Sequence, residues 1–137
     1  VQGICPTGWH VPRDNEFKTL KNYVKAQSEF QCGNNESYIA KSLASNSGWR
    51  NSTYSCAVGN NQFNNNATGF TAVPAGYYEL NGNNCQGFGE GTHFWSTQIG
   101  INDTTGANGY IMSYGGAVFS DFFINQRVGR SVRCVRN

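Results

Sequence analysis

The chain has 137 residues, of which 13% are charged and 14% aromatic, with 17 glycines and a formal net charge of +2. The aromatic content excludes an intrinsically disordered chain, and the small net charge gives no reason to expect a nucleic-acid partner or binding to an anionic membrane. The length predicts a single domain over residues 1–137, and no run of 18 apolar residues predicts a membrane span.

The first predicted element is a helix over residues 15–27 (NEFKTLKNYVKAQ). Its apolar side chains recur at helical spacing and would form one buried stripe. The stripe consists of Phe17, Leu20, Val24 and, as a further candidate, Tyr23. Asp14 is the expected N-cap, because its carboxylate can accept an otherwise unpaired backbone N–H of the first turn.

A second, shorter helix is predicted over residues 37–45 (SYIAKSLAS), with Ile39 and Leu43 facing the core. Gly48 then marks its exit, and the helical period does not return further along the chain. Two stretches rich in Asn and Gly, 60–70 and 79–91, predict turns, because these residues tolerate positive φ.

Short strands are predicted in the remaining part of the chain, where β-branched and aromatic residues are bounded by turn residues. The candidates are residues 70–80, 93–98, 109–114, 117–124 and 131–136. Helices first and strands afterwards indicate an α+β fold with an antiparallel sheet and long loops.

Five cysteines are spread along the chain without a CxxC pair, and His10 and His93 are its two histidines. A zinc site is therefore not expected. Spread cysteines in a loop-rich domain favour a disulfide framework formed in an oxidising compartment. Because five is odd, at least one thiol is free or pairs outside the chain. Spacing alone leaves the connectivity open.

Several segments, taken together, are similar to a known family. They are ICPTGWHVP at 4–12, SLASNSGW at 42–49, CAVGNNQ at 56–62, NATGFTAVPAGYY at 66–78, FWST at 94–97 and SVRCVRN at 131–137. In this order they resemble the Fibrobacter succinogenes major paralogous domain over essentially the whole chain. That family is typical of surface or secreted proteins of Bacteroidota and Fibrobacterota, and is related to the C-type-lectin-like and formylglycine-generating-enzyme folds.

The resemblance implies a C-type-lectin-like fold in which two N-terminal helices flank a small antiparallel sheet that holds both chain ends. It also implies that Cys5 pairs with Cys134 and that Cys32 pairs with Cys56. Cys85 would then be the unpaired thiol. A rival pairing, Cys56 with Cys85, would instead leave Cys32 free.

Catalysis and calcium binding are both poorly supported by the residues present. The formylglycine-generating relatives use a redox-active cysteine pair and copper, whereas Cys85 would stand alone without a nearby histidine to activate it. Lectins that hold calcium carry an EPN- or QPD-like triplet and a WND-like triplet. This chain has neither, and Asn102 and Asp103 resemble the WND-like triplet only weakly. We therefore expect no enzyme activity, no catalytic residue, no metal ligand and no cofactor.

A candidate ligand-binding region lies between residues 93 and 130. Alternation along a strand sends successive side chains to opposite faces, yet both faces here would receive large groups. Either the sheet is covered on both sides, or some of these side chains form an exposed binding face. The candidate binding residues are Tyr110, Tyr114, Phe119, Asp121, Phe122, Phe123, Asn125 and Arg127.

These observations predict a non-catalytic recognition or adhesion module outside the cell or on a bacterial surface, as on a pilus or lipoprotein. It would bind glycan or protein through a loop-rich face formed by residues 79–127. One alternative is a structural subunit of a surface filament or matrix that self-assembles or is linked through Cys85. Another is a ligand-binding protein diversified by a retroelement. In residues 99–130 only Met112 and Gln126 fall outside the residues that mutated Asn codons can encode.

Overall fold

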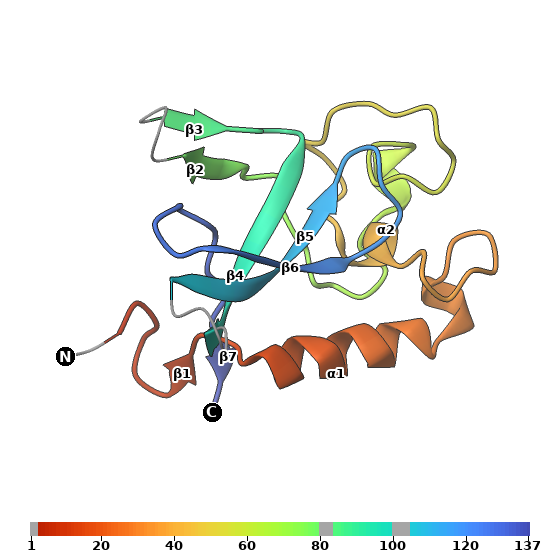
Figure 1. Cartoon of the computed structure of the whole chain (residues 1–137). Coiled ribbons are helices and arrows are strands. Elements are labelled where there is room, and N and C mark those ends of the chain that lie inside the picture. The colour runs from red at the N-terminus through yellow and green to blue at the C-terminus, as the bar shows by residue number, and fades with distance from the viewer. Residues whose placement is uncertain (1–2, 80–83, 100–104) are drawn as a thin grey trace.

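A computed structural model describes residues 3–79, 84–99 and 105–137 of the chain. As predicted, the fold is α+β. One long helix packs against a three-stranded antiparallel sheet, and two small two-stranded sheets adjoin it (Figure 1). Among the described residues, no helix is long and apolar enough to cross a membrane.

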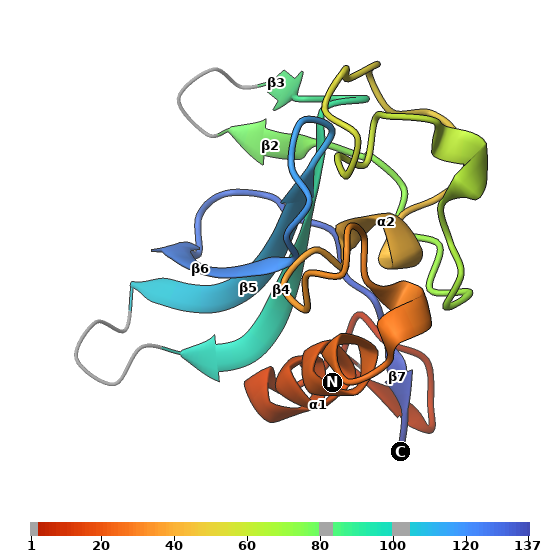
Figure 2. The ribbon, with the colours of Figure 1, turned by 90° about the vertical axis from the view of Figure 1, so that its right-hand side faces the viewer.

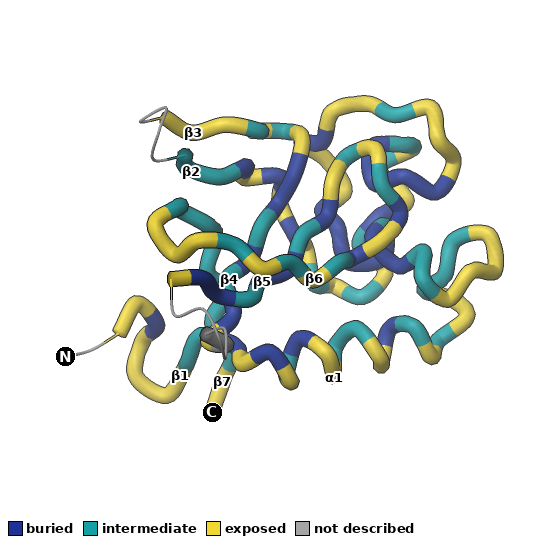
Figure 3. The backbone as a smooth tube through the Cα atoms, in the orientation of Figure 1, coloured by how far each residue is buried: buried dark blue, intermediate teal, exposed yellow. Residues whose placement is uncertain are grey.

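The long helix, α1, spans Asp14–Lys25 and buries the predicted apolar stripe. Phe17 and Val24 are buried, and Leu20 packs against the core from its edge. Figure 3 shows buried and exposed positions alternating along this helix. Tyr23 does not belong to the stripe, because it is 61% exposed. One residue before Val24 on a helix, it points about 100° away from the buried side.

The predicted N-cap is wrong by one residue. Arg13 is the N-cap, with an extended backbone, and its N–H donates a 2.8 Å hydrogen bond to the Glu16 carboxylate. Asp14 is the first helical residue, and its carboxylate is buried. There it accepts a 2.9 Å hydrogen bond from the hydroxyl of Tyr110 and lies 2.6 Å from Nζ of Lys18. A tertiary contact therefore takes the place of the expected cap.

The second helix, α2, is a single turn over Ala40–Leu43 and is shorter than predicted. Ile39 and Leu43 are buried, as expected. The helix stops because Ala44 turns to an extended backbone and forms a parallel bridge with Ala72. Two 3-10 turns complete the helical part, η1 at Ser28–Phe30 and η2 at Gln62–Asn64.

The central sheet contains β4 (Gly91–Ile99), β5 (Gly106–Ser113) and β6 (Ser120–Asn125) in the order β4–β5–β6, all antiparallel. It corresponds to the strands predicted at 93–98, 109–114 and 117–124. Its register places Phe94 opposite Tyr110, and Tyr110 opposite Asp121. Both helices lie on the same side of β4, as Figure 2 shows.

The other strands form two separate pairs. β1 (Trp9–His10) pairs with β7 (Val135–Arg136), so the chain ends meet in a sheet of their own rather than in the central one. β2 (Tyr77–Glu79) pairs with β3 (Asn84–Gln86). β1 was not predicted from the residues, although the family resemblance implied that the N-terminal end lies in a sheet. β3 was not predicted and lies inside a stretch expected to be turns. Conversely, only the last part of the strand predicted at 70–80 forms a strand.

The core lies between α1, α2 and the inner face of the central sheet. Aromatic rings make up much of it. Phe17 stacks on Tyr110 with the ring centroids 4.4 Å apart, and Phe119 lies 5.3 Å from Tyr110. Burial of these large rings supplies the main drive for folding in a chain with so few charged residues.

Two disulfides close the fold, with the pairing that the family resemblance implied. Cys5 is bonded to Cys134, and Cys32 to Cys56. The rival pairing of Cys56 with Cys85 is therefore wrong. Cys85 is a free thiol that is exposed on β3.

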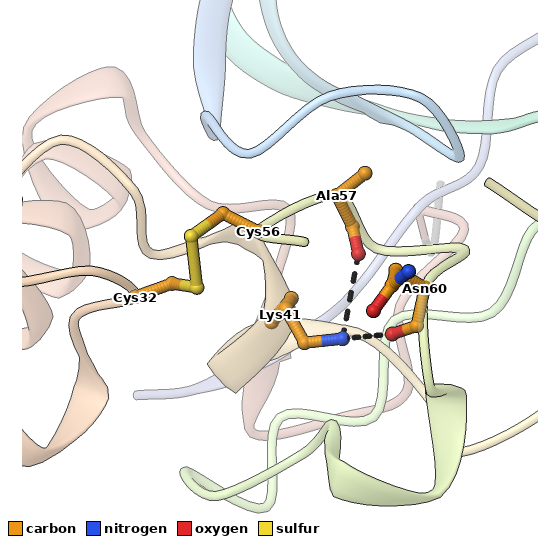
Figure 4. The surroundings of a disulfide bond; sticks show 5 residues. All are labelled: Cys32, Lys41, Cys56, Ala57 and Asn60. Atoms are coloured by element: carbon orange, nitrogen blue, oxygen red, sulfur yellow. Dashed lines mark hydrogen bonds between the residues drawn. A yellow bond between two sulfur atoms is a disulfide. The ribbon is translucent and has the colours of Figure 1, made fainter. Parts of the chain in front are cut away.

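Lys41 lies beside the second disulfide (Figure 4). Its ammonium donates hydrogen bonds to the backbone carbonyls of Ala57 and Asn60, and burial lowers its pKa. These two hydrogen bonds hold the 57–60 loop close to Cys56. We therefore regard Lys41 as a structural residue.

Candidate functional site

The two faces of the central sheet differ in what covers them. Side chains of paired residues share a face, so Phe94, Tyr110 and Asp121 point to the side of α1. Their chain neighbours point to the opposite face, which we call the outer face. Its large residues are His93 and Trp95 on β4, Ile111 on β5, and Phe122 and Ile124 on β6. All of these are partly exposed.

Four aromatic rings form a continuous surface on this outer face. The ring of His93 lies 5.0 Å from that of Tyr77 and 5.9 Å from that of Phe122. The rings of Trp95 and Phe122 are 6.3 Å apart. Arg130 lies against the rings of Tyr77 and Phe122. We call these five residues, Tyr77, His93, Trp95, Phe122 and Arg130, the aromatic platform.

Gly109 makes room for the platform in the middle of β5. It is the cross-strand partner of both Trp95 and Phe122. A Cβ at this position would lie 2.6 Å from Cζ of Phe122 and 2.5 Å from the carbonyl oxygen of Phe94. The Phe122 ring can lie across β5 because this residue has no side chain.

The backbone on both sides of Arg130 is fixed. Gly129 and Tyr78 exchange two hydrogen bonds of 2.9 Å. Ser131 donates to the carbonyl of His93 at 2.9 Å and accepts from the N–H of Trp95 at 3.0 Å. Arg130 therefore bridges β2 and β4, and its side chain starts from a well-defined position.

The Arg130 guanidinium packs over aromatic rings rather than against an acid. Its central carbon lies 4.3 Å from the ring centroid of Tyr77 and 6.0 Å from that of Phe122. Nε and Nη1 are buried without a hydrogen-bond partner. Burial lowers the pKa of this group, although at neutral pH it still carries its charge.

His93 is the neutral member of the platform. Burial, assisted by the charge of Arg130, lowers its pKa to about 4, so the imidazole is uncharged at neutral pH. Its Nδ1 is buried without a partner. The platform therefore combines one fixed positive charge with four uncharged aromatic rings.

The prediction is wrong for two of the binding residues, because their side chains belong to the core. Tyr110 and Phe119 are both fully buried. Burial and the bond to Asp14 raise the pKa of the Tyr110 phenol, which therefore stays protonated. Neither side chain offers surface to a ligand, and both pack against Phe17 instead.

Three predicted residues lie on the opposite face of β6 from the platform. Asp121 pairs with Nζ of Lys21 on α1 at 3.1 Å. Phe123 is 47% exposed, and its ring lies close to Gly106 on β5. Asn125 is exposed at the end of the strand.

The other predicted residues are divided between the platform and the loops. Arg127 is exposed, and its backbone N–H bonds to Oδ1 of Asn125. Tyr114 is partly buried, with the guanidinium of Arg50 over its ring at 5.2 Å. Phe122 is the predicted residue that the structure brings into the platform.

Four platform residues were not among the predicted binding residues, although the candidate region 93–130 includes three of them, His93, Trp95 and Arg130. The i, i+2 spacing in HFW was enough to place His93 and Trp95 on one face of a strand. Tyr77 and Arg130 carried no such signal, because they come from separate segments that meet only in the folded chain. The expected face at 79–127 also includes residues 80–83 and 100–104, which lie outside the described residues.

No group of three or more His, Cys, Asp and Glu side chains that could hold a metal ion occurs among the residues that the structure describes. Asn102 and Asp103, the weak calcium candidates, lie outside this part of the chain.

Comparison with known proteins gives one assignment. No curated protein and no solved structure matches the chain. A family model does match, and it covers residues 1–136, nearly the whole sequence. The chain belongs to the Fibrobacter succinogenes major domain family.

Proposed function

We propose that this protein is a non-catalytic recognition module that binds its ligand on the aromatic platform. The observation that carries the proposal is the set of partly exposed rings of Tyr77, His93, Trp95 and Phe122 on the sheet face opposite α1. Aromatic residues grouped with an arginine are typical anchors of recognition surfaces.

A glycan is the ligand class that this surface fits best. The apolar C–H face of a sugar ring can stack on an aromatic ring, while its hydroxyls remain free to hydrogen-bond. Rings of Trp and Phe about a sugar's width apart offer two such stacking positions (6.3 Å between the centroids of Trp95 and Phe122). A protein ligand would use the same residues as hydrophobic anchors, and the experiment below distinguishes the two.

The proposal includes a cell-surface or extracellular location and a C-type-lectin-like relationship. Two disulfides are typical of chains that fold in an oxidising compartment. Paired chain ends, two helices and a small sheet with long loops support the relationship.

The first experiment is binding of the purified domain to a broad glycan array. Trp95→Ala and Phe122→Ala are the test variants, because each removes one ring of the platform. Phe123→Ala is the matched control, since it removes an exposed ring from the other face of the same strand. We expect specific binding that both test variants weaken about tenfold or more, as when an interface anchor is truncated.

Each result has a distinct meaning. Binding that survives Trp95→Ala and Phe122→Ala but is lost in Phe123→Ala would move the site to the helix side of β6. A folded domain that binds no glycan but captures a defined protein through Trp95 would support the protein ligand. Loss of binding in all three variants, with folding intact, would show that the platform has no special role.

A structural subunit of a surface assembly is the second candidate. The free thiol of Cys85 is exposed on β3, and Phe88, just after that strand, is 84% exposed. Sedimentation at increasing concentration, with and without reductant, tests this candidate. A dimer that Cys85→Ser abolishes would favour it, and a monomer at all concentrations would exclude it.

A further inference from the structure

Resting on the proposed function of the platform, we propose that its ligand is an acidic glycan whose carboxylate binds the guanidinium of Arg130. The ligand class is thus a uronic-acid-type sugar, with its ring stacked on Trp95 or Phe122. The inference comes from the unpaired state of Arg130 and from the groups that surround it.

Arg130 is a partly buried charge without a counter-ion. Five ion pairs join described residues, and none of them includes Arg130. Its Nε and Nη1 are buried without acceptors. Two buried nitrogens without partners leave the charge poorly solvated, so an anion that reaches the remaining nitrogen, Nη2, gains more here than at an exposed arginine.

Stacking on Tyr77 does not supply the counter-ion or the hydrogen-bond acceptors that Arg130 lacks. The ring contacts the flat face of the guanidinium at 4.3 Å. The N–H groups point outward in the guanidinium plane, so cation–π contact does not use them as donors. The ring holds the plane of Arg130, and because Nε and Nη1 are buried, Nη2 is the nitrogen that would meet a carboxylate.

The charge is also positioned before a ligand arrives. The hydrogen bonds of Gly129 and Ser131 fix the backbone on each side of Arg130. Less conformational freedom is then lost on binding than with a mobile surface arginine. Arg127, three residues earlier, is exposed and lacks such a setting.

The charged and titratable neighbours leave Arg130 as the dominant charge of the platform. Glu79 acts on it from β2, but no ion pair joins the two side chains. Tyr77 lies against it, and the charge of Arg130 helps to lower the pKa of His93. His93 is neutral above its pKa of about 4. An anionic ligand therefore meets the charge of Arg130, with Glu79 as the acidic group that also acts on it.

A carboxylate on a sugar satisfies both parts of the platform at once. The carboxylate accepts a hydrogen bond from Nη2 of Arg130, with the added strength of a charge-assisted contact. The sugar ring rests on Trp95 or Phe122, which lie on the same outer face. A neutral sugar would fill only the second part.

The test compares matched pairs of acidic and neutral oligosaccharides. Oligogalacturonate, hyaluronan and alginate fragments are arrayed with their carboxyl-reduced forms, and the affinity of any hit is measured by calorimetry. Dextran sulfate serves as a general polyanion. Arg130→Gln is the test variant, and Arg127→Gln is the matched control, because it removes the same charge from an exposed turn nearby.

We expect one or more acidic fragments to bind about tenfold or more tightly than their reduced forms, the range for a charge-assisted contact at a partly exposed site. Arg130→Gln should abolish this preference while it preserves the weak binding of the reduced form. Arg127→Gln should leave the preference intact. Dextran sulfate should compete poorly.

Three outcomes would overturn the inference. Equal binding of acidic and reduced forms through Trp95 would leave the glycan-binding function standing but remove the role of the carboxylate. Equal loss in Arg127→Gln and Arg130→Gln, or strong competition by dextran sulfate, would show unspecific attraction. Absence of binding to any sugar would refute the glycan ligand itself.

Discussion

The hydroxyl of Tyr110 donates a 2.9 Å hydrogen bond to the carboxylate of Asp14, joining β5 to the first residue of α1 across 96 positions of sequence. Both groups are buried. The bond engages the carboxylate that was expected to cap the helix. Strand register places Tyr110 on the inner face, and the opposite face of the sheet carries the platform.

Replacing Tyr110 by Phe should lower the free energy of unfolding by about 1–2 kcal/mol, because the Asp14 carboxylate loses a buried donor. Lys18 remains 2.6 Å from Asp14 and limits the loss. Urea unfolding measures the change. In a double-mutant cycle with Asp14→Asn, the two effects should be less than additive. Additive effects would show that the bond contributes nothing.

Removing the Cys5–Cys134 disulfide should destabilise the chain more than removing Cys32–Cys56. The first joins residues 129 apart and the second residues 24 apart. The chain-entropy model gives about 5 and about 3.5 kcal/mol, respectively. Urea unfolding of the two Cys→Ser pair variants tests the order, with Cys85→Ser as a control that should change little. The reverse order would mean that contacts at the disulfides outweigh loop closure.

His10 should stabilise the paired chain ends most strongly at mildly acidic pH. Its ring bonds to the Glu16 carboxylate at 2.9 Å and to the Asn137 side chain at 2.6 Å, and these contacts raise its pKa above 6.5. The stabilisation is therefore complete below pH 6.5 and is lost as the pH rises through the folded-state pKa.

Glu16 sets the lower limit of this window. Its bonds to the Arg13 backbone and to His10 lower its pKa below 4.5, so its contribution is present above that pH and is lost on further acidification. Between pH 4.5 and 6.5 both groups contribute fully. His10→Gln should thus lower the Tm more at pH 5.5 than at pH 8.5. An equal change at both values would contradict the charged interaction.

His93 should affect stability in the opposite way to His10: its contribution should be lost as the pH falls. Its pKa falls to about 4 on folding, so the unfolded chain binds the proton more readily between pH 4 and 6.5. Stability should fall as the pH drops through this range, by about 1 kcal/mol once solvent screening of the half-buried ring is considered. The difference in unfolding free energy between pH 7 and 4.5 should be smaller in His93→Gln. An unchanged difference would assign the effect to other groups.

Gly109→Ala should displace the Phe122 ring of the platform, because the ring lies across this position of β5. The new methyl group would lie 2.6 Å from the Phe122 ring and 2.5 Å from the backbone of Phe94. We expect a loss of about 1–3 kcal/mol, the usual cost of overpacking, together with a changed near-ultraviolet circular dichroism signal. Gly115→Ala is the control, because a Cβ there meets nothing within 4 Å. Equal, small effects would show that the Phe122 ring can move freely.

The sequence by itself determined the local elements that depend on neighbours in the chain. The helix at Asp14–Lys25 follows from the spacing of Phe17, Leu20 and Val24, and the three central strands follow from β-branched and aromatic residues bounded by turn residues. The family motifs also implied both disulfide pairs. These features depend on residue periods or on motifs that can be read along one segment.

Tertiary structure alone decided which residues share a surface. Tyr110 and Phe122 look alike in sequence, yet β5–β6 pairing sends one into the core and the other to the outer face. Tyr77 lies beside His93 because the bridge between Gly76 and Thr92 places β2 next to β4, and Arg130 joins them because Gly129 and Ser131 bridge to Tyr78 and Phe94. A one-residue change of register exchanges the two faces of a strand, so the platform depends on long-range pairing that no single segment encodes.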